Sequence, residues 1–382
     1  MKKKILFAID ILRGGGAEKV LIDIVKNLNK DKFDITVLSI FDGGKYVEEV
    51  KKYAKYTYIF PKYNSENYFF KLINSFKYRI SKFTLRRLSP KLLYKNYVKE
   101  KYDYEVSFLE GYSATIISGS NNINSKKIAW IHIDLIENPW SNNYFKYQDE
   151  KDMYSKFDNI VCVSYDVKKA FEKKFNIKNT LVKYNPVDEN LIRSLSNEDI
   201  DIDSGGKFLI TTIGRLEPQK SYDRLLIVHK KLIELGYNYE LWIIGEGNEK
   251  ENLENYILEN NLTSSVKLLG FKKNPYKYLG KSNLFVCSSL SEGFSTVATE
   301  ATILGIPIVT TNCSGMEELL GDSEYGIITE NSIEGLYNGL LKILDDKNLY
   351  NYYLCKAKER STYFQLKNRM DEIEKLFKWL GD

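Results

Sequence analysis

Short apolar segments alternate with helix-length segments along most of the chain, and this alternation limits the fold more than any other feature. Runs rich in apolar, β-branched and aromatic residues predict buried strands. Most are followed by a polar loop and then by apolar residues at helical spacing. Strand–loop–helix units in series indicate an α/β fold with parallel sheets. The expected strands are residues 5–9, 33–40, 104–108, 127–133, 159–163, 181–184, 208–213, 239–244, 266–269, 284–287, 308–311 and 325–329.

Length and composition allow two domains, each with its own core. The chain has 382 residues, of which 43% are hydrophobic and 14% aromatic. A chain of this size buries enough apolar surface for two domains of ordinary size. Residues 194–207 (SLSNEDIDIDSGGK) are polar and contain glycine, so we interpret them as a linker between the two halves.

Several classes of protein are disfavoured by the sequence. The apolar run 5–9 is too short for a signal peptide, and no window approaches the roughly 18 apolar residues of a spanning helix. With His132 and His229 as the only histidines, a histidine-rich metal site is excluded. We expect a cytoplasmic protein whose thiols are reduced, without a disulfide or zinc set. The cysteines are Cys162, Cys287, Cys313 and Cys355.

Positive charge is concentrated in the first half. Residues 1–188 hold 34 Lys/Arg and 22 Asp/Glu, a balance of +12, whereas the remainder holds 22 and 29, a balance of −7. Within residues 71–101 there are ten Lys/Arg and one acid, Glu100, mixed with aromatic and aliphatic residues. Such a segment fits an anionic membrane surface, and it fits a solvated helical face equally well. We expect no nucleic acid partner, because no recognition motif accompanies the charge.

The stretch 284–301 (LFVCSSLSEGFSTVATEA) predicts a strand, a small-residue turn and a helix capped by Ser295 or Thr296. Backbone N–H groups at such a helix start favour an anion, most often phosphate. Glu292 lies in the turn and Glu300 in the helix. Taken singly, each carboxylate could be an ordinary solvated charge.

Two other loops follow predicted strands. Residues 12–18 (LRGGGAE) include three consecutive glycines, which let backbone approach a ligand closely, although they do not match a dinucleotide fingerprint. In residues 214–221 (GRLEPQKS), Arg215 and Lys220 flank a turn before a helix, an arrangement suited to a diphosphate. His132 ends another strand, at the edge where open α/β sheets bind ligands.

Taken together, these motifs resemble the family-4 glycosyltransferases, which are retaining, use nucleotide sugars and have the GT-B fold. The resemblance is carried by Glu292 and Glu300 at a spacing of seven intervening residues, by Gly293-Phe294, and by GIPIV at 305–309. It covers the whole chain and is most specific over residues 208–330. Ser295 and Ser221 stand where the family usually has Gly.

The resemblance implies a role for each motif. Glu292 would hold hydroxyls of the donor sugar, Glu300 the ribose, and His132 the donor sugar. Nucleobase contacts would come from loops containing Gly245, Gly270 and Phe271. The residues expected to bind the donor are Gly15, Gly16, Arg215, Lys220, Gly293, Phe294, Ser295, Thr296 and Glu300.

The same resemblance implies two doubly wound, Rossmann-like domains facing across a cleft. They would comprise an acceptor-side domain at 1–190, a nucleotide-sugar domain at 191–365, and a helix at 366–382 packing back on the first. Because Arg215, Lys220 and backbone N–H groups would stabilise the charge on the diphosphate, we expect no metal requirement and no cofactor beyond the nucleotide sugar. The D-x-D pattern of Asp199, Asp201 and Asp203 mimics a metal motif, but it lies in the linker, so we discard it.

The expected function is retaining transfer of a hexose from a nucleoside diphosphate sugar, with UDP the favoured carrier, to a glycan. The basic first half favours a lipid-linked acceptor of surface polysaccharide assembly, reached at the inner face of the membrane. A protein acceptor stays open. So do a sugar-nucleotide epimerase or hydrolase of the same fold and a non-catalytic partner subunit; the intact site residues argue against the last.

Overall fold

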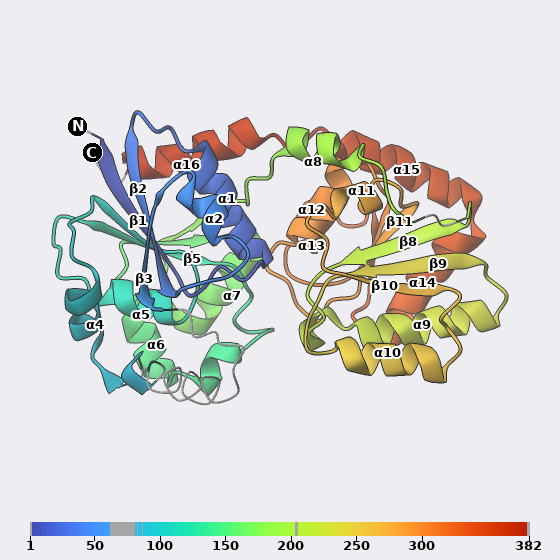
Figure 1. Ribbon diagram of the computed structural model, residues 1–382, viewed down its shortest axis with the longest axis horizontal. Helices are drawn as coiled ribbons and strands as arrows, with labels where there is room; N and C mark the ends of the chain where they lie inside the picture. The colour runs from blue at the N-terminus through green and yellow to red at the C-terminus, as the bar shows by residue number, and fades with distance from the viewer. Residues whose placement is uncertain (1, 62–80, 82, 86, 203–204, 380–382) are drawn as a thin grey trace. The chain divides into compact units, whose positions relative to one another are not determined.

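The computed structural model describes residues 2–61, 81, 83–85, 87–202 and 205–379 (Figure 1). The chain forms two compact units. Unit 1 comprises Met1–Pro186 together with Lys367–Asp382, and unit 2 comprises Val187–Leu366. Each unit is built on one parallel sheet with helices on both faces.

The sheet of unit 1 has seven strands in the order β3-β2-β1-β4-β5-β6-β7 among the described residues, all parallel. β1 lies at its centre and is buried from Ile5 onward, as expected of a strand covered on both faces. The strands are β1 (Lys3–Ile9), β2 (Phe33–Phe41), β3 (Lys55–Phe60), β4 (Tyr104–Ser107), β5 (Lys126–Ile131), β6 (Asn159–Cys162) and β7 (Thr180–Val182).

Helices connect these strands and carry their apolar side chains inward. In α1, for example, Val20, Leu21, Ile24 and Val25 recur at helical spacing and are buried. The helices of unit 1 are α1 (Gly16–Asn27), α2 (Val47–Lys51), α4 (Pro90–Tyr97), α5 (Tyr112–Ser118), η1 (Trp140–Asn143), α6 (Tyr147–Tyr154), α7 (Tyr165–Phe175) and α16 (Leu366–Trp379).

The sheet of unit 2 has six parallel strands in the order β10-β9-β8-β11-β12-β13 in the described part of the chain. Both sheets therefore reverse direction beside their first strand, the doubly wound arrangement. This part of the sequence prediction is confirmed. The strands are β8 (Phe208–Ile213), β9 (Tyr239–Ile244), β10 (Val266–Gly270), β11 (Leu284–Cys287), β12 (Ile308–Thr311) and β13 (Ile327–Thr329).

The helices of unit 2 form two layers. α9, α10 and α14 lie together on one face of the sheet, and α8, α11, α12 and α15 lie on the other (Figure 1). The core on the first face includes Leu226, Leu241 and Leu340. The helices are α8 (Glu189–Ser196), η2 (Pro218–Lys220), α9 (Tyr222–Glu234), α10 (Lys250–Glu259), α11 (Tyr276–Leu279), α12 (Thr296–Ile303), α13 (Met316–Leu320), α14 (Ile333–Asp345) and α15 (Lys347–Ser361).

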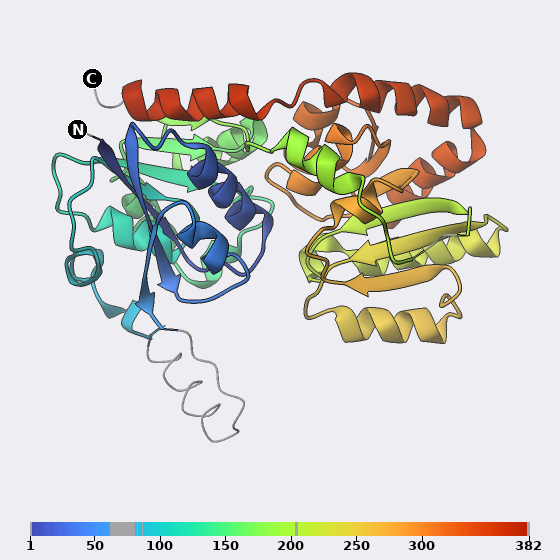
Figure 2. The same cartoon turned by 45° about the horizontal axis from the view of Figure 1, so that its top comes forward.

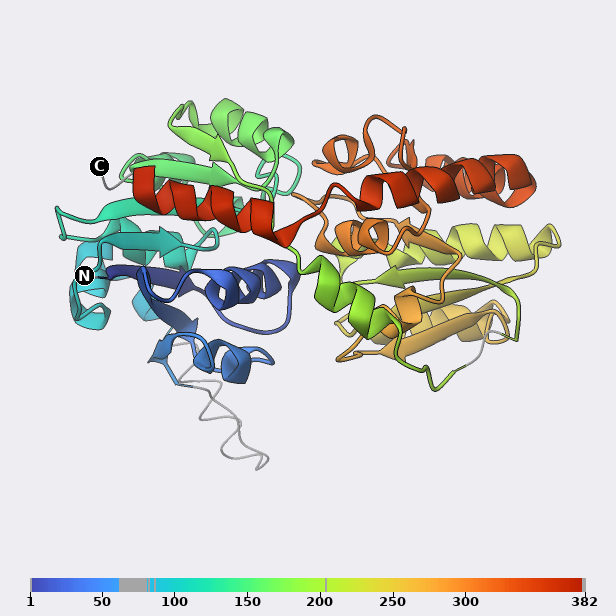
Figure 3. The same ribbon diagram turned by 90° about the horizontal axis from the view of Figure 1, so that it is seen from above.

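Helix α16 follows unit 2 in the chain but packs on unit 1, beside α1 (Figures 2 and 3). Its Phe377 ring meets the rings of Phe7, Phe33 and Tyr104 edge-on, with centroids 5.3–6.1 Å apart. Glu374 of α16 accepts a 3.0 Å hydrogen bond from the N–H of Asn29. The aromatic contacts and the hydrogen bond tie this helix to the sheet of unit 1.

Some sequence interpretations differ from the structure. The strand Lys55–Phe60 was not expected, because only part of it is apolar and its side chains are half-buried or exposed. The interpreted linker begins inside helix α8, which runs to Ser196. Much of the predicted basic segment 71–101 lies outside the described residues, so its membrane role stays a prediction. In the part that the structure describes, every helix is too short or too polar to span a bilayer.

Candidate functional site

The candidate site of unit 2 lies at the point where its sheet changes direction. β8 and β11 are neighbours, but the chain leaves their carboxyl ends toward different parts of the sheet. Loops at such a point diverge, and ligands of open α/β sheets bind there. The two loops are residues 214–221 and 288–295.

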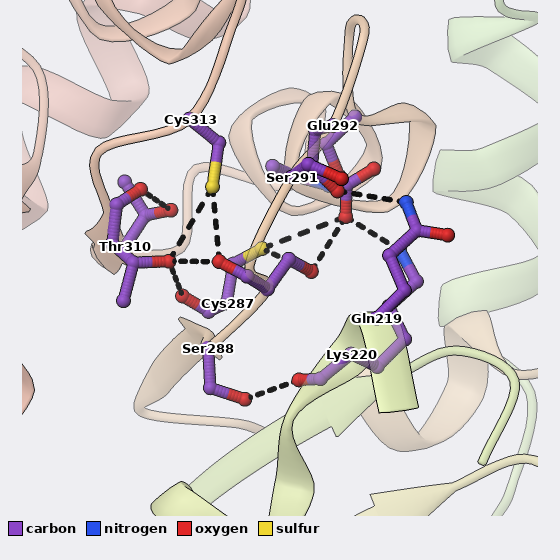
Figure 4. A network of polar contacts seen from close by, with 12 residues as sticks. Gln219, Lys220, Cys287, Ser288, Ser291, Glu292, Thr310 and Cys313 are labelled. Atoms are coloured by element: carbon purple, nitrogen blue, oxygen red, sulfur yellow. Dashed lines mark hydrogen bonds and ion pairs between the residues drawn. The ribbon is translucent and has the colours of Figure 1, made fainter. Parts of the chain in front are cut away.

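Side chains and backbone join these two loops (Figure 4). The Gln219 side-chain amide donates to the Ser291 carbonyl at 2.7 Å. The Leu290 N–H donates to the Gln219 carbonyl at 2.8 Å, and the Ser288 hydroxyl donates to the Lys220 carbonyl at 2.8 Å. The loops therefore form one structure rather than two independent segments.

A buried ion pair lies inside this structure. Lys220 Nζ lies 2.5 Å from Glu292 Oε1, and the Ser289 hydroxyl donates to the same oxygen at 2.6 Å. Glu292 is 9% exposed, so it is not the solvated loop acid that a single carboxylate could have been. Burial by itself would lower the pKa of Lys220, but the charges of Glu292 and its neighbours raise it above the ordinary value. Lys220 is therefore a fixed positive charge.

Residues at the end of the neighbouring strand β12 and just after it donate hydrogen bonds to the loop that contains Glu292. The Thr311 hydroxyl donates to the Ser289 carbonyl at 2.6 Å, and the Cys313 thiol donates to it at 2.9 Å. Sequence reasoning missed Ser289, Thr311 and Gln219. The sequence shows only that polar residues follow the predicted strands. That pattern does not distinguish a residue that hydrogen-bonds to the site from one in a solvated turn.

Helix α12 begins after Ser295, one of the two residues predicted to cap it. Ser295 is the N-cap, and its hydroxyl accepts from the N–H of Ala298 at 3.4 Å, whereas Thr296 is the first helical residue. The preceding Gly293 and Phe294 pack closely on the next loop: a Cβ at Gly315, where φ is +80°, would lie 2.6 Å from the Gly293 carbonyl oxygen. The start of α12 is thus held rigidly, with its first N–H groups at the switch point.

Glu300 is 4% exposed and points into the unit, not into solvent. Its Oε1 accepts from the Tyr276 hydroxyl at 2.9 Å. The interpretation of Glu300 as a surface charge is therefore excluded. A carboxylate buried within a helix requires polar partners, and Tyr276 of α11 is one that the sequence did not indicate.

Arg215 and Ser221 complete the loop after β8. The Arg215 side chain is exposed and has no hydrogen bond or ion pair with any residue that the structure describes. Ser221 adopts φ +52°, a left-handed conformation that favours glycine. The family usually has Gly here, so this departure keeps the backbone geometry at some conformational cost.

The three predicted nucleobase residues lie at the carboxyl ends of β9 and β10. Gly245 has φ +153°, and a Cβ there would lie 1.8 Å from the Gly214 carbonyl oxygen. Its N–H donates to the Gly270 carbonyl at 3.0 Å. Phe271 follows and is 41% exposed. The loops after β8, β9 and β10 are therefore joined at their glycines, and an aromatic ring stands beside them.

The glycine loop of unit 1, which we expect to let backbone approach a ligand closely, holds one of its own side chains at the helix start. Gly15 caps α1 and Gly16 is its first residue. The N–H groups of Gly14 and Gly15 both donate to the Glu18 carboxylate, Gly14 at 2.6 Å. Because an acidic side chain already occupies this helix start, a phosphate there would have to displace it.

His132 follows β5 and is 9% exposed. Its ring lies 4.8 Å from the Phe108 ring. Burial lowers its pKa to about 3, so the imidazole is neutral at physiological pH. Its Nε2 is buried without a hydrogen-bond partner among the described residues. A neutral ring of this kind can exchange hydrogen bonds with a hydroxyl but cannot supply charge. By contrast, His229 bonds Ser265 at 2.8 Å inside unit 2.

No cluster of three or more metal-ligating side chains occurs in the described ranges. Of the D-x-D residues, Asp201 accepts from the Tyr278 hydroxyl at 2.6 Å and lies 3.8 Å from Lys272 Nζ. Asp203 lies outside the described residues. The contacts of Asp201 are those of a surface acid that fixes the linker.

Comparison with known proteins finds a family match for the second half of the chain. Residues 197–360 match the family model described as Glycosyl transferases group 1. A Campylobacter jejuni protein, the N-acetylgalactosamine-N,N'-diacetylbacillosaminyl-diphospho-undecaprenol 4-alpha-N-acetylgalactosaminyltransferase, is 35% identical over 216 residues, covering 56% of this chain and 58% of that protein. An uncharacterized glycosyltransferase of Haemophilus influenzae is 26% identical, covering 97% of this chain and 99% of its own. The chain thus spans less than two thirds of the first relative and nearly all of the second.

Solved structures share the whole fold. HepE of Anabaena in complex with UDP-glucose aligns with a TM-score of 0.76 at 19% identity, covering 98% of this chain and 99% of that one. This likeness confirms the predicted GT-B fold.

Proposed function

We propose that this chain is a group 1 glycosyltransferase, as the match of residues 197–360 and the Campylobacter relative support, and that it transfers a hexosyl group from a UDP-sugar to a hydroxyl of a lipid-linked glycan, with retention of anomeric configuration. One observation carries the proposal. The buried Lys220–Glu292 pair and the start of α12 meet at the switch point of unit 2.

The physical problem of the reaction is charge. As the bond from the sugar to the diphosphate loosens, negative charge grows on the leaving diphosphate. Lys220 is a fixed cation, Arg215 is exposed in the same loop, and the first N–H groups of α12 add the positive end of a helix dipole. These groups are positioned before the substrate arrives, which is what transition-state stabilisation requires.

Glu292 suits the donor sugar in this proposal. Its Oε1 is engaged by Lys220 and Ser289, so its charge is balanced and its position fixed. A carboxylate held in this way accepts hydrogen bonds from sugar hydroxyls more readily than it attacks carbon, because attack would break the ion pair. The retention we propose therefore does not use Glu292 as a nucleophile. The diphosphate itself would take the acceptor's proton.

Glu300 and the glycine loops suit the nucleoside. Glu300 is held by Tyr276 and would accept from the ribose hydroxyls. Gly245, Gly270 and Phe271 would line the base. Gly293 and Phe294 would present backbone to the diphosphate, and His132 of unit 1 would contact the donor sugar through its free ring nitrogen. The role of Gly15 and Gly16 requires that Glu18 first be displaced.

The positive charge of residues 1–188 and the name of one relative both support a lipid-linked acceptor. The Campylobacter relative is named for a diphospho-undecaprenol substrate, and residues 1–188 carry a balance of +12. A basic unit is attracted to the anionic headgroups beside such a lipid. We expect the protein to act at the cytoplasmic face of a membrane.

The test uses purified protein, a panel of UDP-, GDP- and ADP-sugars, and glycans on undecaprenyl diphosphate and on short soluble carriers. We expect transfer from a UDP-sugar, with the product linkage of the same anomeric configuration as the donor by NMR. Sugar release or epimerisation that no acceptor in the panel diverts would overturn the proposal. That result would favour the epimerase or hydrolase alternative.

Metal removal gives a second test. Arg215 and Lys220 supply positive charge where other enzymes place a divalent ion, so turnover in EDTA should stay within about a factor of two. A loss of turnover that Mn²⁺ restores would contradict the proposed charge arrangement.

A further inference from the structure

The switch point of unit 1 carries a group of three side chains, of which the proposed reaction uses only His132. β1, β4 and β5 are adjacent in the sheet, and Ala8 pairs with Ser107, which pairs with Ala129. Asp10, Glu110 and His132 follow these paired positions by two or three residues. All three side chains therefore start from the same sheet edge, and sequence analysis singled out only His132.

Asp10 and Trp140 both lie close to Gly111, on the side where a Cβ would stand. Gly111 has φ +100°, and a Cβ there would lie 2.9 Å from Trp140 Cη2 and 3.6 Å from Asp10 Oδ2. The other carboxylate oxygen, Asp10 Oδ1, accepts from the N–H of Ser113 at 2.9 Å. One oxygen thus anchors helix α5, and the other lies on the same side of Gly111 as the edge of the indole ring.

The aromatic residues of this group reach the surface. Trp140 is half-buried, and its ring lies 5.7 Å from that of Tyr144, which is 45% exposed. Large aromatic rings at the surface supply apolar contact at little entropic cost. A sugar ring has an apolar C–H face and hydroxyls at its rim, so an aromatic platform beside a carboxylate matches both parts of it.

The buried side of the group holds further polar atoms. Glu110 Oε1 accepts from the N–H groups of His132 and Ile133, at 2.5 and 3.2 Å. His132 Nε2 has no partner among the described residues. Buried polar atoms are nearly always hydrogen-bonded in native structures, so an unpartnered nitrogen here indicates a ligand or a bound water. Burial also raises the pKa of Asp10 to about 6 and that of Glu110 to about 7, a perturbation typical of functional sites.

We propose that Trp140 and Tyr144 stack against one sugar ring of the acceptor glycan, and that Asp10 Oδ2 accepts a hydrogen bond from a hydroxyl of that ring. Asp10, Trp140 and Tyr144 are then specificity residues on the acceptor side, with Glu110 positioning the backbone at His132. The ligand class, a pyranose within a glycan, rests on the proposed function. The subsite itself rests on the geometry of unit 1.

The experiment measures acceptor and donor kinetics for Trp140→Ala, Trp140→Phe and Asp10→Asn in the full chain. The matched control is Tyr165→Ala, which removes an exposed aromatic ring elsewhere in unit 1. We expect Trp140→Ala and Asp10→Asn to raise the acceptor KM about 10-fold. Trp140→Phe keeps an aromatic face and should raise it less, while the donor KM stays unchanged in all variants. An unchanged acceptor KM in folded Trp140→Ala overturns the subsite and leaves the proposed function intact.

A binding measurement keeps the proposal testable if no transfer is found. Trp140 is half-buried, whereas Trp130 and Trp242 are fully buried, so its fluorescence should respond to a ring stacked on it. Titration of wild-type protein with free N-acetylhexosamine oligosaccharides should quench or shift the emission, and Trp140→Phe should remove the change. Emission that no oligosaccharide alters would overturn the proposal independently of catalysis.

Discussion

In the proposed reaction, the Lys220–Glu292 pair would serve both the fold and the chemistry. Both charges are largely buried, and removing one partner of such a pair leaves the other uncompensated. Substitutions at this pair therefore combine a chemical effect with a stability effect. Glu300 accepts a hydrogen bond from the neutral hydroxyl of Tyr276.

We predict that Glu300→Gln weakens UDP binding, whereas Glu292→Gln mainly lowers kcat. A hydrogen bond to a charged group is worth about 1.5–3 kcal/mol, so UDP affinity should fall roughly 10- to 100-fold in Glu300→Gln. Isothermal titration of UDP and steady-state kinetics distinguish the two. Equal losses of UDP affinity in both variants would contradict the assignment, and Tyr276→Phe serves as a milder control for Glu300.

Glu110 predicts a pH-dependent stability. Burial raises its pKa to about 7 from the ordinary 4.5, so between these values the folded state binds more protons than the unfolded state. Its contribution to the free energy of unfolding is therefore largest below about pH 4.5 and is lost as pH rises through 7. Asp10 acts in the same direction, since burial raises its pKa to about 6 from 3.8.

Glu110→Gln keeps a hydrogen-bond acceptor for His132 and Ile133 but cannot ionise. Urea denaturation at pH 5.5 and pH 8 should show a fall in wild-type stability from this group of about 2 kcal/mol. The fall should be clearly smaller in the variant. An identical pH dependence in the two proteins would show that Glu110 is not protonated in the folded state.

At the scale of elements, the spacing of apolar residues predicted most of the buried strands and the helices that follow them. Buried central strands such as β1 and β11 are continuous apolar runs, and they stand where expected. Lys55–Phe60 did not stand out, because an edge strand is half-solvated and mixes lysine with tyrosine. Ser295 was one of two predicted caps, and only the packing of Gly293 against Gly315 shows how the turn enters the helix.

The charged residues of the candidate site are visible in the sequence, whereas their supporting contacts are not. Glu292, Glu300, Arg215 and Lys220 carry charge, and charge beside a strand end is visible in a sequence. Their supports, Ser289 and Tyr276, are ordinary residues whose value comes from neighbours far along the chain. A single sequence does not reveal such long-range contacts.

A substitution at Gly245 tests whether the close backbone contact between the loops after β8 and β9 matters for stability and UDP binding. A methyl group there would meet the Gly214 carbonyl oxygen at 1.8 Å, so Gly245→Ala should lower stability by about 2–4 kcal/mol and weaken UDP binding. Gly236 is the matched control, because it also has positive φ, +92°, but has open space around it. Gly236→Ala should cost about 1 kcal/mol. Thermal melting checks both, and equal costs would argue against the close backbone approach.

At the scale of the molecule, one unit is assembled from two distant parts of the sequence. Lys367–Asp382 belongs to unit 1, although all of unit 2 separates it from Pro186. Phe377 is fully buried in this junction. The stability of unit 1 therefore depends on a helix that is not its neighbour in the chain.

We predict that Phe377→Ala destabilises unit 1 by about 3–5 kcal/mol, the usual cost of removing a buried phenylalanine. Amide hydrogen exchange should show lost protection in β1, β2 and β4, while β8 and β9 keep theirs. Tyr352→Ala, at an exposed position of α15, should change neither unit. A uniform loss of protection throughout the chain would mean that the units do not unfold separately.

The discontinuity of unit 1 also has a consequence during translation. A ribosome adding about 5–20 residues per second needs roughly 10–40 s to make residues 187–366 before α16 can emerge. Through that interval, the nascent unit 1 lacks the ring that covers Phe7, Phe33 and Tyr104. Pauses in translation across unit 2 should therefore lengthen the time in which the nascent chain is open to chaperones, proteases and aggregation.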